Sequence, residues 1–413
     1  MMEEMYIRAG RLITGADHEV VEDGAVRIEE GKIVAAGPAT EVLPPAGAEA
    51  SVVRYDDATI LPGLIDAHVH LTIRRGETVP RHAAEVTDEQ ALLLGVRAAR
   101  QVLAAGVTTV RDCAARGRHA QALRDAVEEG IIAGPRILAS GKPITTTAGH
   151  IWPISYEADS VTEVRRAVRQ LVKEGVDFIK VCATGGRMTP GSVMGRAQYS
   201  VEELRAVVED AHRFGLHVAA HALGTEGIVR AVEAGIDTIE HCTWLDLDSE
   251  GVAFDEEAAR MMAAQGTVAN FASNPPWQLL EEYDEAADQS LSAQPAGLVS
   301  RVRHRWQLVK RMRTLGVPVC FATDSGYGAW RDFHDLSYLA QVLVEQADFE
   351  PLDVIEMLTA APAQAIGWGD RLGTLAPGKI ADLLVVSGNP ASDIRALHQV
   401  QAVYQGGVLA VGS

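Results

Sequence analysis

Short alternations of apolar and polar residues, broken by glycines, open the chain. They occupy residues 5–58, with clear examples at residues 6–9, 24–28 and 31–37. Alternation places successive side chains on opposite faces of a strand, and glycine supplies the turns between strands. No segment of this region has the spacing of a helix of useful length. The pattern therefore predicts a set of short β-strands.

From about residue 60 apolar runs of strand length alternate with amphipathic stretches of helical spacing. The strand candidates cover residues 64–69, 107–113, 136–140, 176–183, 216–220, 238–241, 267–271 and 317–323. The helical stretches include residues 89–105, 161–174, 201–214 and 224–234. Strands that alternate with helices in this way favour an α/β fold, a (β/α)8 TIM barrel at residues 60–366. A doubly wound open sheet is the structural alternative.

The strand pattern returns after a helical segment at residues 351–366. Residues 373–382 lead into a strand at 383–386, and further strands are expected at 400–404 and 408–411. These β-rich segments and those at the start of the chain flank the barrel. We therefore expect residues 1–59 and 367–413 to pair into one small discontinuous β-sandwich domain.

Residues 272–305 interrupt the rhythm of the barrel, because they are long for a connection from strand to helix. They carry Pro275, Pro276 and Trp277, followed by acidic and Ser/Gln-rich sequence. Long loops at the carboxyl face of a barrel often close over ligands, which makes this segment a candidate lid. A plain surface excursion is the alternative.

Composition narrows the range of partners. The 413-residue chain is 47% hydrophobic, but it has no charge-free apolar run of the roughly 18 residues that would span a membrane. Its net charge of −19 would repel a phosphate backbone, so we expect a small-molecule substrate and neither nucleic acid nor membrane. The N-terminus lacks the basic start and apolar middle of a secretory signal, which predicts a cytoplasmic location.

Two histidines end the first strand of the predicted barrel. His68 and His70 are two positions apart, so their side chains face the same side of the strand. They lie at the carboxyl end of the strand, where barrel enzymes build their active sites. Paired imidazoles suit a zinc-type ion, although hydrogen-bonded histidines without metal are the alternative for this motif alone.

Four further polar residues end apolar runs elsewhere in the chain. They are His221, His241, Asp324 and Lys180. Since the carboxyl ends of the barrel strands converge, we expect these side chains to meet the two histidines. A buried ammonium needs compensation, which a salt bridge could supply. Alternatively, Lys180 has reacted with CO₂ to form a carbamate, whose two oxygens can bridge two cations.

The set of H-x-H, Lys, His, His and Asp resembles the amidohydrolase superfamily over essentially the whole chain. Residues 61–70, 178–186 and 323–325 are similar to the branch that contains Xaa-Pro and Xaa-Arg/Lys dipeptidases and related amidases. Residues 378–383 match its C-terminal signature. Superfamily members commonly self-associate, so the resemblance also implies a homo-oligomer.

The resemblance implies two divalent metal ions, most simply zinc. It assigns His68, His70 and Asp324 to the more buried ion, and His221 and His241 to the more exposed one. N6-carboxylysine at Lys180 would bridge both ions. These ligand assignments come from the resemblance and not from the spacing of the residues.

Candidate substrate contacts follow the same strands. His150 belongs to a Gly-His pair after the third strand, and in the resembling dipeptidases such a pair faces the substrate. Arg187 or Tyr199 could receive a substrate carboxylate, while Trp244 and Asn270 are lesser candidates for the pocket. An ordinary loop, surface or packing role is the alternative for each of them.

We therefore predict a metal-dependent hydrolase that cleaves an amide, most simply in a dipeptide or an N-acyl amino acid. Metal-activated hydroxide would attack the carbonyl, and Asp324 would accept the water proton and pass it to the leaving amine. A hydrolase of a cyclic amide, a urea or carbamate, or a lactone is the alternative in the same fold. A mononuclear deaminase is a further rival, and an inactive metal-bound scaffold is the non-enzyme alternative.

Overall fold

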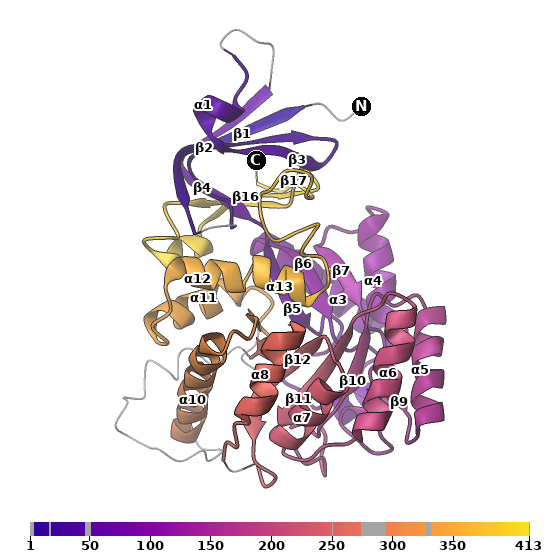
Figure 1. Ribbon diagram of the computed structural model, residues 1–413. Coiled ribbons are helices and arrows are strands. Elements are labelled where there is room, and N and C mark those ends of the chain that lie inside the picture. Colours follow the sequence, from indigo (N-terminus) through magenta and orange to yellow (C-terminus); the bar gives the residue numbers. More distant parts are fainter. Residues whose placement is uncertain are drawn as a thin grey trace.

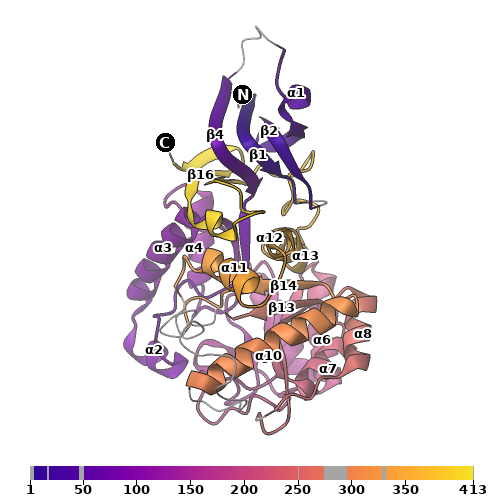
Figure 2. The same cartoon turned by 90° about the vertical axis from the view of Figure 1, so that its left-hand side faces the viewer.

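The computed structural model describes residues 4–15, 18–45, 51–249, 251–273, 295–327 and 332–412. A layer of strands from both chain ends lies above a larger α/β body (Figure 1). The indigo strands of the beginning of the chain and the yellow strands of its end lie side by side in both views (Figure 2). Most of the candidate lid, residues 274–294, lies outside the described residues.

The two chain ends combine in one seven-stranded sheet. Its strand order is β17-β16-β15-β4-β1-β2-β3. The strands are β1 (Met5–Ile13), β2 (Val20–Glu29), β3 (Lys32–Pro38), β4 (Ser51–Pro62), β15 (Leu383–Ser387), β16 (Val400–Gln405) and β17 (Val408–Val411). The short helix α1 (Ala39–Val42) follows β3, and the 3-10 helix η2 (Ile394–His398) precedes β16. A sandwich consists of two packed sheets, whereas one continuous series of pairings links all seven strands here. The expected sandwich therefore stays a prediction.

The strand β4 holds this sheet together. It pairs in parallel with β1 on one side and antiparallel with β15 on the other, so it joins segments more than 300 residues apart. Ile7, Ile60 and Val385 come from these three strands and are fully buried in a shared core. Buried apolar positions interspersed with more accessible ones along β1 and β2 are consistent with the strand pattern seen in the sequence.

The α/β body contains two sheets of parallel strands. The first has the order β14-β13-β12-β11-β10-β8-β9 and the second the order β5-β6-β7. The strands are β5 (Leu64–Val69), β6 (Val107–Asp112), β7 (Arg136–Ala139), β8 (Ile144–Thr145), β9 (Tyr156–Glu157), β10 (Ile179–Cys182), β11 (Val218–Gly224), β12 (Thr238–Leu245), β13 (Val268–Ala272) and β14 (Val319–Ala322). Each of the eight strands expected from sequence overlaps one of them, whereas β8 and β9 were not expected.

Helices follow most of these strands and cover the body. They are α2 (Val79–Glu85), α3 (Asp88–Ala104), α4 (His119–Glu128), α5 (Val161–Lys173), α6 (Val201–Arg213), α7 (Thr225–Glu233), α8 (Glu256–Gln265), α10 (Pro295–Thr314), α11 (Leu336–Glu345), α12 (Pro351–Met357) and α13 (Ala360–Ala365). A short 3-10 helix, η1 (Trp152–Ile154), precedes β9. The helix α6 illustrates the local cause, since Ser200 and Glu203 form a capping box at its start. Its buried face includes Leu204 and Val207.

Backbone hydrogen bonds connect both edges of the three-stranded sheet, β5 and β7, to the seven-stranded one. Beyond β5 and β14, Asp324 N donates to His68 O at 2.9 Å and His70 N donates to Ser325 O at 2.8 Å. On the other side, Asp177 N, just before β10, donates to Ala139 O of β7 at 2.9 Å. Since the strands run in the same direction, their carboxyl ends gather at one end of the body. In the part of the chain that is described, no helix is long and apolar enough to cross a membrane.

Candidate metal-binding active site

The strand β5 brings His68 and His70 to the carboxyl end of the body. Both are buried, at 2% and 3% exposure. Their ring centroids lie 5.1 Å apart, with the rings nearly perpendicular. His70 N donates to Ser325 O, and Asp324 N donates to His68 O. These two hydrogen bonds fix the end of β5 against the segment after β14. The two imidazoles therefore extend from a rigid backbone.

The strands β11 and β12 add two more histidines to the same place. The ring centroid of His241 lies 5.0 Å from that of His68 and 4.6 Å from that of His221. His241 Nδ1 bonds to Ala272 O at 2.8 Å, which leaves its Nε2 available to a ligand. His221 Nε2 lies 3.1 Å from Gly185 O, so its Nδ1 is the available nitrogen.

Lys180 lies on β10 among these histidines. It is 2% exposed, and its Nζ has no hydrogen-bond partner within the described part of the chain. A buried ammonium without a partner is costly. The side chain therefore needs a counter-charge or a chemical modification, which is the condition that carboxylation or metal would meet.

Asp324 completes the group at the end of β14. Its Oδ1 lies 3.2 Å from His70 Nε2 and 3.7 Å from His68 Nε2. Ligands that surround zinc tetrahedrally at 2.0–2.1 Å lie about 3.4 Å from one another. The spacing of these three atoms therefore fits a metal ion, and the donor set of imidazole and carboxylate is one that zinc accepts.

The backbone of two of these residues adopts a conformation that L-residues rarely use. The φ angle is 68° at His241 and 55° at Asp324. Left-handed backbone at residues other than glycine is held in place by the surrounding structure and is concentrated at functional sites. Here the left-handed conformation occurs within β12 at His241 and just after β14 at Asp324.

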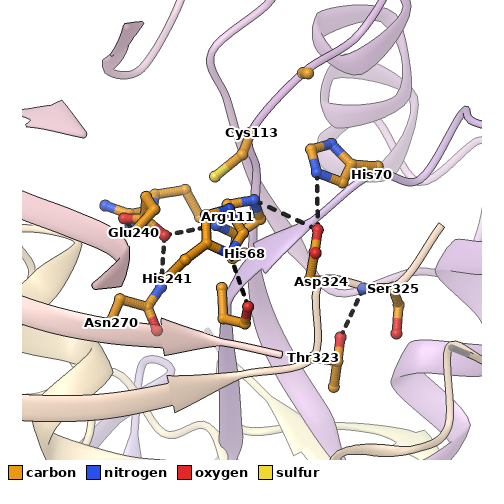
Figure 3. A network of polar contacts seen from close by, with 12 residues as sticks. His68, His70, Arg111, Cys113, Glu240, His241, Asn270, Thr323, Asp324 and Ser325 are labelled. Carbon is orange, nitrogen blue, oxygen red and sulfur yellow. Dashed lines mark hydrogen bonds and ion pairs between the residues drawn. The ribbon is translucent and has the colours of Figure 1, made fainter. Parts of the chain in front are cut away.

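A buried polar network of hydrogen bonds and an ion pair holds His68 in place (Figure 3). Glu240 Oε2 lies 2.6 Å from His68 Nδ1 and accepts a hydrogen bond from Asn270 Nδ2 at 2.8 Å. The other oxygen of Glu240 forms an ion pair with Arg111, and both side chains are at most 1% exposed. A carboxylate behind a metal-ligating histidine fixes its ring and tautomer, so His68 presents Nε2 to the site.

A second buried carboxylate orders the end of β14. Asp66 accepts hydrogen bonds from Thr323 N at 3.1 Å and from Thr323 Oγ1 at 2.6 Å. Thr323 Oγ1 in turn accepts from Ser325 N at 3.0 Å. Burial raises the pKa of Asp66 to about 7 even though these hydrogen bonds act in the opposite direction. Asp66 thereby positions the residues on either side of Asp324.

His150 lies directly against the site. Its ring centroid is 4.3 Å from that of His221, and it is 5% exposed. A Cβ atom on Gly186 would lie 2.3 Å from His150 Cε1, so only glycine lets the loop after β10 approach this closely. Burial, together with the charges of His241 and Lys180, lowers the pKa of His150 to about 3.

The other expected substrate contacts do not gather in the same way. Tyr199 lies in the core, where its hydroxyl donates to Ala158 O at 2.9 Å. Trp244 is fully buried and its Nε1 donates to Met312 Sδ. Arg187 is exposed on the loop after β10. Asn270 Nδ2 donates to Glu240 Oε2 at 2.8 Å and to Ala67 O at 3.5 Å, so it supports the strand of His68.

Sequence reasoning missed the residues that hold the ligands in place. Arg111, Glu240 and Asp66 are all buried and all lie within apolar strands. A charged residue at such a position is itself a signal, because it must find a partner or a ligand. Its partner could not be read from the sequence, since the partners come from other strands.

Comparison with known proteins agrees with this geometry. The sequence profile of the amidohydrolase family matches residues 59–410. Ochratoxinase from Aspergillus niger is 28% identical over 98% of this chain and 86% of its own length. Imidazolonepropionase from Rhizorhabdus wittichii is 28% identical over 92% of each chain. A solved structure of a Xaa-Pro dipeptidase, with methionine bound in its active site, has a TM-score of 0.81. It is 30% identical and covers 98% of this chain and 99% of its own.

The fold and the site define an α/β enzyme whose polar residues gather at the carboxyl ends of parallel strands. The chain belongs to the amidohydrolase family. It is a hydrolase that acts on carbon–nitrogen bonds, and its buried histidine and carboxylate groups are candidates for holding a metal.

Replacement of Glu240 by Gln tests the support of His68. The variant removes the counter-charge of buried Arg111, so we expect the free energy of unfolding to fall by about 3–5 kcal/mol. Metal affinity should fall about 10–100-fold, because His68 loses the carboxylate that orients it. Urea unfolding and chelator competition measure the two quantities. The control Glu256→Gln changes an exposed carboxylate on α8 and should leave metal affinity unchanged; equal metal affinity in E240Q would contradict the assigned role.

Stability of the metal-free protein should fall as the pH falls. Burial lowers the pKa values of His68, His70, His150, His221 and His241, so at these five positions the unfolded chain binds more protons than the folded one below about pH 6.5. Asp66 and Asp112, whose pKa values burial raises to about 7, act in the opposite direction but are fewer. The contribution of His150 is complete above pH 6.5 and is lost as the pH falls toward about 3. At pH 5 its loss amounts to about 2 kcal/mol.

Thermal unfolding of chelator-treated protein between pH 7.5 and pH 5 measures this effect. The variant His150→Gln should show a shallower fall in Tm over the same range, since it lacks one of the titrating groups. Equal falls in Tm for the wild type and for H150Q would be inconsistent with a neutral, buried His150.

Proposed function

We propose that the two parallel sheets close into one (β/α)8 barrel of residues 60–366. The bridge between Val69 and Ser325 and the hydrogen bond from Asp177 N to Ala139 O support closure at the two edges. Residues 1–59 and 367–413 would form the separate β-domain. The site then lies where barrel enzymes place their catalytic residues, at the carboxyl face.

We propose further that the protein is a metal-dependent amidohydrolase that cleaves an amide bond in a dipeptide or an N-acyl amino acid. The observation that carries this proposal is the convergence of polar side chains from different strands. The ligands would be His68, His70, Lys180, His221, His241 and Asp324. His68, His70 and Asp324 would hold one ion, His221 and His241 the other, and carboxylated Lys180 would bridge them. The similarity of the chain to a Xaa-Pro dipeptidase and to an ochratoxinase supports an amide substrate.

Zinc held by these residues would supply Lewis-acid chemistry: polarisation of the substrate carbonyl, and a lowered pKa of a bound water that makes hydroxide available near neutral pH. The protein positions and moves the protons. Asp324 accepts the proton of the attacking water on its carboxylate and then delivers it to the nitrogen of the leaving amine. Burial of the surrounding side chains excludes bulk water and strengthens each polar contact with the substrate.

His150 has a separate role toward the substrate. Its pKa of about 3 keeps the imidazole neutral at ordinary pH, so one ring nitrogen donates and the other accepts. Thr189 Oγ1 lies 3.4 Å from His150 Nδ1, which leaves Nε2 to the substrate. As a neutral donor, His150 would stabilise charge that develops on the carbonyl oxygen.

Replacement of Asp324 by Asn should abolish amide hydrolysis while the fold remains. Asn has the same shape but cannot accept and return the proton, so we expect kcat/KM to fall by at least about 10²-fold. Turnover of a library of dipeptides and N-acyl amino acids, with Tm measured beside it, tests this. The control Asp125→Asn changes α4 and should retain activity; near-normal activity of D324N would remove the proposed proton transfer.

Replacement of Lys180 by Ala should remove activity that acetate or propionate partly restores. A short carboxylic acid can enter the space of the side chain and supply the missing oxygens. Metal analysis of protein purified without chelator should give about two ions per wild-type chain and fewer in the variant. Lys173→Ala on α5 serves as the control. One ion per wild-type chain, with no rescue of K180A, would rule out the bridging carboxylate.

A further inference from the structure

Tyr327 lies beside the site, three residues after Asp324. Its ring packs against the imidazole of His70, with centroids 4.1 Å apart and planes at 61°. Only 5% of the residue is exposed. Gly326 makes this arrangement possible, because its φ angle is +102° and a Cβ atom there would lie 2.2 Å from His70 O. The chain therefore folds back tightly over His70 and lays Tyr327 across the end of the body.

The hydroxyl of Tyr327 is buried without a hydrogen-bond partner among the described residues. Other tyrosines of the protein satisfy their hydroxyls. That of Tyr199 donates to Ala158 O at 2.9 Å, and those of Tyr55 and Tyr404 bond to one another at 2.8 Å. Buried tyrosine hydroxyls normally find such partners. A phenol that is unpaired at the edge of an active site therefore points to a partner that arrives with the ligand.

Besides the His70 ring and the nearby carboxylates of Asp324 and Asp112, Tyr327 meets an apolar surface. It belongs to a small cluster with Ile73, Ala114, Ile151 and Cys182. These residues follow β5 and β6, flank His150 and end β10, so the cluster forms a wall beside the metal-binding candidates. Within the cluster the hydroxyl of Tyr327 is the one strong hydrogen-bonding side-chain group, and at neutral pH a phenol is protonated and able to donate.

We propose that Tyr327 is a substrate-binding residue whose hydroxyl donates a hydrogen bond to a carbonyl-type oxygen of the ligand held beside His70. This inference rests on the proposed function and extends it by adding a contact from the segment after Asp324. The hydroxyl is buried, which strengthens the hydrogen bond because water does not compete for it. The contact therefore orients the carbonyl group relative to Asp324 and His150.

The test compares metal-loaded wild type with Tyr327→Phe and with the control Tyr55→Phe. The probe is acetohydroxamate, a small metal ligand that carries a carbonyl oxygen and requires no knowledge of the natural substrate. Titration calorimetry should show that Y327F binds it about tenfold more weakly, while Y55F binds it as the wild type does. Metal content should be equal in all three proteins, and Tm of Y327F should not fall, because the ring remains and an unpartnered group is removed.

Turnover separates this inference from the proposed function. On any amide substrate, kcat/KM of Y327F should fall about 10²-fold if the hydrogen bond strengthens in the transition state. Weaker probe binding by Y327F supports the role of Tyr327 even if no amide is cleaved by the wild type. Equal probe affinities, or no binding by either protein, would overturn the inference, including when D324N shows that amide hydrolysis itself is correctly assigned.

Discussion

The ion pair between Arg111 and Glu240 is the interaction on which the site depends. Both charges are buried among parallel strands, where either alone would be strongly destabilising. The pair leaves Glu240 free to hold His68 and Asn270, while Arg111 Nε donates to Ala67 O at 2.8 Å. Strands β5, β6, β12 and β13 are thereby fixed to one another directly beneath the candidate metal ligands.

Rigid backbone near the candidate ligands also holds their side chains in place. The left-handed conformations of His241 and Asp324 are maintained by neighbours, including Asp66, which binds both the backbone and the side chain of Thr323. Glycine is required where the loop after β10 closely approaches the site, at Gly186 against His150. Polar side chains that a metal would need are therefore held in place by contacts that do not themselves involve metal.

The sequence could predict which strands carry chemistry, but not how they support it. A polar residue that ends an apolar strand can be recognised without knowing which strands lie beside it. This signal identified His68, His70, His221, His241 and Asp324 as candidates. Glu240 and Arg111 could be linked only through strand register, which depends on pairing across more than 100 residues. Tyr199 was misleading for the same reason, since its distance from the site is set by tertiary packing. Eight strands were recognisable from their length and spacing, whereas β8 and β9 are too short to produce a pattern.

The central place of β4 affects the order in which the chain can fold. This strand runs into β5 with only Gly63 between them, so the sheet of the chain ends is directly attached to the strand of His68 and His70. One neighbour of β4, β1, is synthesised before it, but the other, β15, follows more than 300 residues later. During synthesis one edge of β4 must remain unpaired while the α/β body forms. Strands made after the whole α/β body thus complete the sheet to which the strand of His68 and His70 is attached.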